Sequence, residues 1–138
     1  MAVVKELLRA EKDGSLSFGN YELNEKTKLS DVEVNGDIYK VKTFRDITKL
    51  ERNEMLVYES DPGSAVTGFK ENGNGVRFRL DAPEDTQVIL GLEENVPYRV
   101  FINGTDNGIV QTNAGGKLVL SVEMQSGKEA EIEVVKDN

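Results

Sequence analysis

Asn-Gly dipeptides occur five times in this chain, and segments of alternating apolar and polar residues lie between them. Asn and Gly both tolerate a positive φ, which a type I′ turn requires at two consecutive positions. Such turns join paired antiparallel strands. We therefore expect hairpin corners at Asn35-Gly36, Asn72-Gly73, Asn74-Gly75, Asn103-Gly104 and Asn107-Gly108, with Asp13-Gly14 as a sixth dipeptide of this kind.

Between these dipeptides the side chains alternate with a period of two. Val76, Phe78 and Leu80 share one face of an expected strand, and Arg77 and Arg79 share the other. This period is typical of a half-buried strand with one solvated face. The same alternation is present in the segments 98–102, 118–125 and 131–134, whereas 87–90 is apolar on both faces at its centre and predicts a central strand.

Short strands at this spacing predict an all-β fold, an antiparallel β-sandwich of the fibronectin III or immunoglobulin type with an N-terminal β-hairpin region. Asp61-Pro62-Gly63 marks the best boundary, since Pro presets φ at its turn position and Gly accepts a positive φ at the next. We expect an N-terminal β region over 1–61 and a C-terminal sandwich over 64–136. Without a low-complexity linker, the two should pack as one unit.

Two segments of the first half leave alternatives open. Val3–Glu11 fits a short helix or a first strand, and the strand is favoured because Leu16 and Phe18 follow at strand spacing. In Thr43–Leu50 the apolar residues lie three apart, which fits a helical or 3₁₀ stretch.

The chain of 138 residues contains no Cys and no His. Without them it has no disulfide framework, no thiol nucleophile, no Ser-His-Asp triad and no imidazole or thiolate zinc site. We therefore predict that the protein is not an enzyme and uses no cofactor.

The formal net charge of −8 argues against nucleic-acid binding, which needs a basic stripe. Residues 1–72 and 73–138 are both acidic on balance. No apolar run approaches the ~20 residues of a membrane span. The start, MAVVKELLRA, is interrupted by charges and does not match a signal peptide. We expect a cytoplasmic protein without a membrane partner, with a surface-associated form as the open alternative.

Carboxyl pairs and oxygen-rich loops are the remaining sources of chemistry. A glycosidase needs two carboxyl groups, one with a raised pKa from burial, but we expect the acidic residues of the candidate pairs to lie in solvated turns. These are Asp81, Glu84, Asp85, Glu93 and Glu94. Calcium prefers such oxygens, and the weak candidates for a calcium site, which turn formation also explains, are Asn103, Asp106 and Asn107.

Binding is therefore the favoured function. We expect a structural or binding module that acts through self-assembly or a protein partner, because sheet edges accept added strands. The candidate interface joins Arg77, Arg79 and Arg99 of one copy to Glu131 and Glu133 of another. The alternative is a carbohydrate-binding accessory module, with a glycan stacked on Tyr side chains. A small glycosidase is the third possibility.

Two resemblances accompany this interpretation. Gly91-Leu92, Tyr98-Arg99-Val100, Asn103-Gly104 and then Gly116, Leu118 and Val122 form a run similar to β-sandwich accessory modules at the ends of many bacterial extracellular and polysaccharide-acting proteins. That run covers about a third of the chain, Leu90 to Val135. The segments SFGNYELNEKTKLSDVEVNGDIYKVKTF and VYESDPGSAVTGF resemble small bacterial β proteins sometimes named endosialidase.

The second resemblance implies no activity for this chain. Sialic-acid-cleaving enzymes are larger propellers in which clustered arginines grip the substrate carboxylate. The six arginines here are scattered over separate expected elements, apart from Arg77 and Arg79 on one strand face. No site residue is carried over from the resemblance.

Overall fold

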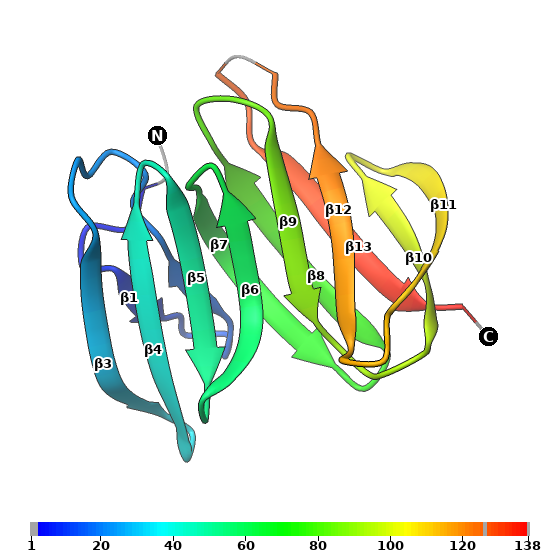
Figure 1. Ribbon diagram of the computed structural model, residues 1–138, viewed down its shortest axis with the longest axis horizontal. Coiled ribbons are helices and arrows are strands. Elements are labelled where there is room, and N and C mark those ends of the chain that lie inside the picture. Colours follow the sequence, from blue (N-terminus) through cyan, green and yellow to red (C-terminus); the bar gives the residue numbers. More distant parts are fainter. Residues whose placement is uncertain (1–2, 126, 138) are drawn as a thin grey trace.

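The computed structural model describes residues 3–125 and 127–137, and these form thirteen β-strands and no helix. The strands make two antiparallel sheets packed face to face, as Figure 1 shows. The predicted all-β sandwich is therefore confirmed, with more strands than the seven to nine of an immunoglobulin domain. Since no helix is present in the described chain, it contains no helix that could cross a membrane.

The sheets have seven and six strands. Sheet A contains, in spatial order, β1 (Leu8–Ala10), β2 (Leu16–Phe18), β7 (Ala65–Asn72), β8 (Gly75–Asp81), β13 (Ala130–Lys136), β10 (Pro97–Ile102) and β11 (Thr105–Gln111). Sheet B contains β12 (Lys117–Val122), β9 (Thr86–Gly91), β6 (Met55–Asp61), β5 (Ile47–Arg52), β4 (Asp37–Phe44) and β3 (Thr27–Val34).

Both expected regions of the chain contribute to both sheets. The hairpin β1–β2 from the first region pairs with β7 in sheet A, and β9 and β12 from the second region extend sheet B beyond β6. The last strand, β13, lies between β8 and β10 and pairs with both. The buried apolar side chains of the two regions form one core.

The alternating segments lie as the period of two predicts. In β8, Val76, Phe78 and Leu80 are buried, while Arg77 and Arg79 are exposed. The centre of the core is aromatic: Tyr58 of sheet B contacts Phe18, Phe69 and Phe78 of sheet A, at ring-centroid distances of 5.2, 6.4 and 5.7 Å. Edge-to-face pairs of this kind add roughly 0.5–1.5 kcal/mol each beyond their buried area, so Tyr58 is a principal contact between the sheets.

A buried polar network surrounds the hydroxyl of Tyr58. Ser64 Oγ lies 2.7 Å from the Tyr58 hydroxyl and 2.6 Å from Ser60 Oγ. The backbone of Ser64 is bonded to Thr48, whose Oγ1 donates to the Ser64 carbonyl (2.8 Å) and accepts from the Ser64 N–H (3.0 Å). Burial raises the pKa of the Tyr58 phenol to about 12. These bonds satisfy polar groups that would otherwise be costly in an apolar core.

The helical interpretation of residues 43–50 is wrong. This segment is the end of β4, a two-residue turn and the start of β5, with Phe44 directly opposite Ile47. Because the turn has two residues, the paired residues that flank it, Phe44 and Ile47, are three positions apart in the sequence, which is also the spacing of residues on one face of a helix. On the inner face, Thr43 and Thr48 are buried and their hydroxyls are hydrogen-bonded at 2.8 Å. In the other open segment, the strand alternative is confirmed for Leu8–Ala10.

The Asn-Gly dipeptides do not all form hairpin corners. Asn35-Gly36 and Asn103-Gly104 have positive φ at both residues, as a type I′ turn requires. The β7–β8 corner is formed by residues 73–74, so neither of its two Asn-Gly pairs sits at the turn centre. Asn107-Gly108 lies inside β11 at a bulge. Asn53-Glu54 forms a corner with positive φ at both residues without a glycine.

The turn that follows β6 also differs from its prediction. The Asp61-Pro62 peptide bond is cis, and Gly63 does not have a positive φ. A Cβ at Gly63 would lie 2.1 Å from the carbonyl oxygen of Phe44. Glycine is required here by the close approach of two backbone segments, rather than by left-handed geometry.

Candidate binding surfaces

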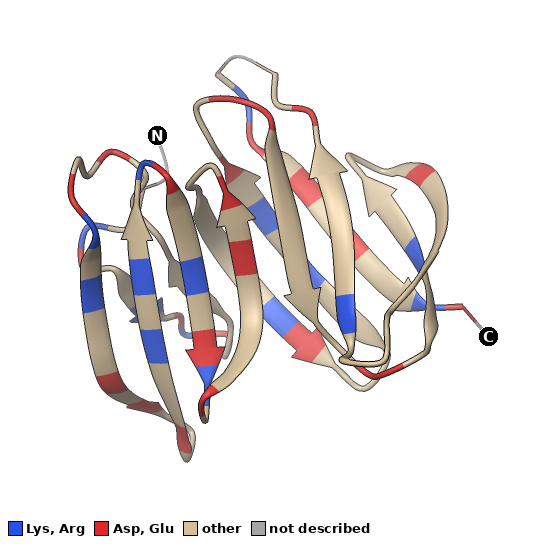
Figure 2. Ribbon diagram, in the orientation of Figure 1, with Lys and Arg blue, Asp and Glu red and all other residues tan. Residues whose placement is uncertain are grey.

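The charged residues predicted as an interface lie on β8, β13 and β10, which carry charged bands in Figure 2, and their alternation with buried residues places them on the outer face of sheet A. Arg77 is directly opposite Glu133, and Arg79 is directly opposite Glu131, across the β8–β13 pair. Opposite charges in register stabilise a sheet by roughly 0.2–1 kcal/mol. One chain therefore provides these arginines with complementary neighbours without a second copy.

Arg99 is also engaged within the chain. Its guanidinium lies 2.8 Å from Asp106 and 3.5 Å from Asp137. Asp106 has a pKa below its usual range, because it accepts the N–H of Gly108 and a bond from Arg99. The calcium candidates are engaged too: the Asn103 side-chain oxygen accepts the N–H of Glu131, and the Asn107 amide donates to a backbone carbonyl. A cation bound to the side-chain oxygens of Asn103 and Asp106 would compete with the bonds that these oxygens accept.

A shallow depression of about 460 Å³ covers the middle of this outer face. Basic and acidic side chains alternate around it, and residues 3–125 and 127–137 contain no group of three or more acidic side chains arranged to hold a metal ion. Its charged and aromatic lining comes from Asp13, Lys70, Arg77, Phe78, Arg79, Phe101, Glu131 and Glu133. The depression offers mixed polarity and no concentrated charge of one sign.

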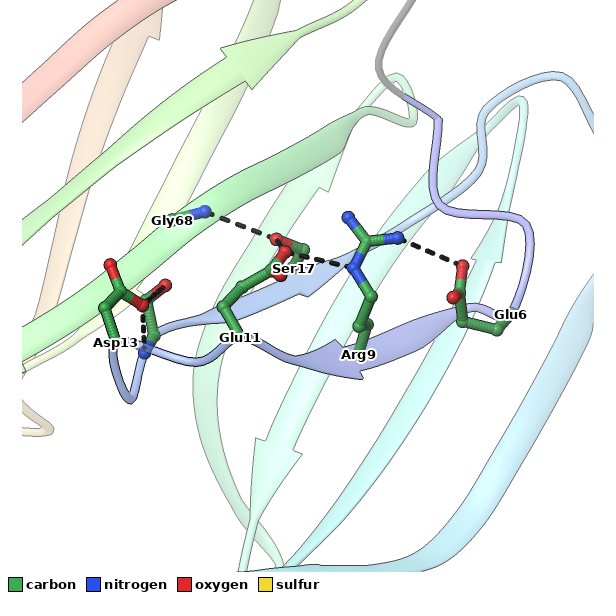
Figure 3. A network of polar contacts seen from close by, with 7 residues as sticks. Glu6, Arg9, Glu11, Asp13, Ser17 and Gly68 are labelled. Carbon is green, nitrogen blue, oxygen red and sulfur yellow. Dashed lines mark hydrogen bonds and ion pairs between the residues drawn. The ribbon is translucent and has the colours of Figure 1, made fainter.

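A polar network joins the N-terminal hairpin to β7 at the border of this face (Figure 3). Glu11 accepts from the Ser17 hydroxyl (2.5 Å) and from Arg9 Nε (3.0 Å), and Ser17 Oγ accepts the N–H of Gly68 at 3.4 Å. The bonds from Ser17 and Arg9 lower the pKa of Glu11, which is the opposite of what a general acid needs. Ser17 is fully buried, so its hydroxyl is closed to a substrate.

The expectation of a solvated turn is wrong for Asp81. This residue ends β8 and is buried, and the Tyr21 hydroxyl donates to its Oδ2 at 3.2 Å. Burial, followed by the charge of Asp81, raises the pKa of Tyr21 to about 12. The pair thus acts as an internal polar contact between the N-terminal region and sheet A.

The other acidic candidates are exposed. Glu84 and Asp85 lie in the β8–β9 loop, where Asp85 accepts the backbone N–H of Met124 at 2.7 Å. Glu93 forms an ion pair with Lys136, and Glu94 is exposed in the β9–β10 loop. The tyrosines, which were the candidates for stacking on a sugar, are not exposed. All four are buried: Tyr21, Tyr39, Tyr58 and Tyr98.

Sequence reasoning did not find the edge of β12. This strand pairs with β9 over six consecutive residue pairs without a bulge, and no strand of the described residues covers its other side. The remaining sheet edges differ: β1 has only three residues, and β3 and β11 each contain a register shift. Short strands and bulges are devices that block pairing with another chain. Among the described edge strands, β12 is the one that combines more than three residues with an unbroken register.

The backbone of β12 directs alternate residues to its two sides. The carbonyl of Gly116 bonds on the β9 side, where it accepts from Leu92 at 2.7 Å. The peptide groups of Lys117 face the free side, where both are bonded to Asn113. The Lys117 carbonyl accepts from the Asn113 N–H, and the Lys117 N–H donates to the Asn113 side-chain oxygen. No described residue bonds the next peptide groups on this free side, which belong to Val119 and Ser121.

Comparison with protein-family models, with curated proteins and with solved structures gave no match. What the protein binds must therefore be inferred from its own surfaces.

Proposed function

We propose that this protein is a non-catalytic binding module that pairs with a β-strand of another chain, in the first place a second copy, along the edge of β12. The observation that carries the proposal is the regular, unbulged register of β12 on a sheet edge that no other described strand covers. Such an edge presents N–H and C=O groups in the geometry that strand addition uses.

Pairing at this edge breaks no bond that the fold already makes. The free peptide groups of Val119 and Ser121 would exchange hydrogen bonds with those of an antiparallel partner. Val119 is 47% exposed and would gain an apolar neighbour. Two identical edges related by a two-fold axis satisfy each other in the same way, which is the commonest form of homodimer.

The mode of association determines its response to salt. Backbone hydrogen bonds and apolar contact change little with ionic strength, whereas association through the Arg77, Arg79 and Glu131 face would weaken as salt screens the charges. Light scattering and sedimentation over a wide range of protein concentration, at low and high salt, should therefore show an association that salt does not abolish. A strict monomer under all conditions would refute the proposal.

A proline at Ser121 provides the sharper test. The N–H of Ser121 faces the free edge, so Ser121→Pro removes a donor for the partner but none from the β9–β12 ladder. Ser121→Ala is the matched control because it keeps the N–H. We expect the proline variant to be monomeric and the alanine variant to associate like the parent. Equal association by two folded variants would exclude pairing at this edge.

A further inference from the structure

Lysines gather on the outer face of sheet B, although the chain as a whole carries a net charge of −8. Figure 2 shows them as blue bands over β3, β4 and β5. Three of them form a row, because Lys28 is directly opposite Lys42 and Lys42 is directly opposite Lys49. We name the following set the lysine face: Lys26, Lys28, Lys40, Lys42 and Lys49.

Like charges directly opposite each other destabilise a sheet. The relief within the chain is partial: Glu51 is directly opposite Lys40 and lies 3.5 Å from Lys49, and Glu59 is directly opposite Lys49. The central Lys42 has a lowered pKa, first because of desolvation and then because the other four lysines repel its charge. An anionic partner would remove a repulsion that the fold leaves in place.

The lysine face is flat around its central row, where the dent between Lys40, Lys42, Lys49 and Glu51 has a volume of only about 60 Å³. A wider hollow of about 730 Å³ begins at Lys40 and Glu51 and extends to Asp31, away from that row. Half-buried apolar side chains border the central row, and the pair Phe44–Ile47 lies next to it on the same face. A flat surface of lysines with apolar neighbours matches an extended anionic plane better than a single anion.

The acidic remainder of the molecule does not prevent such contact. Packed sheets lie about 10 Å apart, so the charges of sheet A are further from the contact plane than the ~8 Å over which physiological salt screens them. A partner that touches only the outer face of sheet B meets the lysines together with Asp31, Glu33, Glu51 and Glu59, and not the net charge of −8 of the whole chain.

We propose that the lysine face is a docking surface for an anionic lipid bilayer, with Lys28, Lys42 and Lys49 at its centre. The expectation of no membrane partner rested on the lack of a spanning segment, and peripheral contact through a sheet face leaves no such segment in the sequence. This docking does not depend on pairing at β12, which lies at the opposite edge of sheet B.

The expected strength follows from the charge count. Each lysine close to an anionic bilayer contributes roughly a fivefold gain in partitioning. Five lysines, offset by Asp31, Glu33, Glu51 and Glu59, leave a net charge of +1 on this face and predict a preference of roughly fivefold for anionic over neutral vesicles. Neutralising the central row should abolish most of that preference.

Sedimentation with vesicles tests the proposal. The probes are phosphatidylcholine vesicles with and without about one third phosphatidylserine. Two triple variants have the same net charge. The first removes the central row: Lys28→Gln, Lys42→Gln and Lys49→Gln. The second removes exposed lysines away from that face: Lys12→Gln, Lys70→Gln and Lys128→Gln. Circular dichroism and thermal melting check that both variants are folded.

We expect the parent and the second variant to bind anionic vesicles but not neutral ones, with binding that weakens as salt rises, and we expect the first variant to lose the preference for anionic vesicles. If the two variants lost vesicle binding equally, binding would depend on net charge alone and not on the lysine face, which would overturn the proposal. Absence of parent binding, or equal binding to neutral vesicles, would also overturn it. Binding to soluble heparin without binding to vesicles would assign the face to a polyanionic chain instead.

Discussion

Removing the hydroxyl of Ser64 should destabilise the protein more than removing the hydroxyl of Tyr58, although the second change deletes part of a much larger side chain. Ser64→Ala removes the partner that two fully buried hydroxyls, those of Tyr58 and Ser60, have at 2.7 and 2.6 Å, and leaves them only their contact with each other. Incomplete hydrogen bonding of buried polar groups costs roughly 1–3 kcal/mol. The expected loss of unfolding free energy is therefore about 2 kcal/mol.

The Tyr58→Phe variant has a different outcome. Ser64 keeps its bond to Ser60 in this variant, so the loss should be only about 1 kcal/mol. In the double variant only Ser60 lacks its partner, and its loss should fall below the sum of the single losses by at least about 1 kcal/mol. This difference is the coupling between the two hydroxyls.

Urea unfolding followed by circular dichroism measures these quantities, because the chain contains no Trp to report by fluorescence. Ser121→Ala is the matched control, an exposed strand serine whose loss should change stability by less than about 0.5 kcal/mol. Midpoints should shift at constant slope. Additive single losses, or a Ser64→Ala variant as stable as Tyr58→Phe, would refute the assignment of the network as a coupled unit.

Three further outcomes follow from the structure. Tyr21 and Tyr58 have pKa values of about 12 in the folded state, above the ordinary value of 10. The stability that they contribute is therefore complete below pH 10 and is lost as the pH rises through 12. The unfolding free energy and the tyrosinate absorbance, both measured against pH, should change together. Gly63→Ala would place a Cβ 2.1 Å from the Phe44 carbonyl oxygen and should lower the melting temperature sharply, whereas a variant that melts like the parent contradicts the close approach. Lys42→Glu should raise stability by about 0.5–1 kcal/mol in urea unfolding, because it converts like-charge neighbours into opposite ones; a loss of stability would argue against repulsion in the row.

Alternation predicted which face of a strand is buried, as Val76, Phe78 and Leu80 show. It did so because successive side chains of a strand point to opposite faces of the sheet, so that the position of a residue in the strand determines its face. The same local logic failed at residues 43–50, where a two-residue turn produced a helix-like spacing. It failed again at Asp81, which the turn chemistry of the following residues placed in solvent but which pairs with Tyr21, far away in the chain.

The candidate surfaces depend on neighbours that no local pattern reveals. Lys28, Lys42 and Lys49 form a row only because β3, β4 and β5 pair in one particular register. The edge of β12 is free because the chain crosses to sheet A after it, instead of adding another strand to sheet B. Register and strand order come from packing of the whole core, and the sequence carries them only as the sum of many long-range contacts.

The position of β13 has a consequence for how the protein is made. Its partner β8 ends at Asp81, whereas β13 ends at Lys136, 55 residues later. At a synthesis rate of roughly 5–20 residues per second, the finished β8 waits for about 3 to 11 s before its neighbour leaves the ribosome. During that interval β8 is an unpaired sheet edge that carries Arg77 and Arg79, and the charge of these side chains disfavours pairing with other nascent chains. When β13 then pairs with β8, Glu131 and Glu133 come to lie opposite these arginines and neutralise their charge.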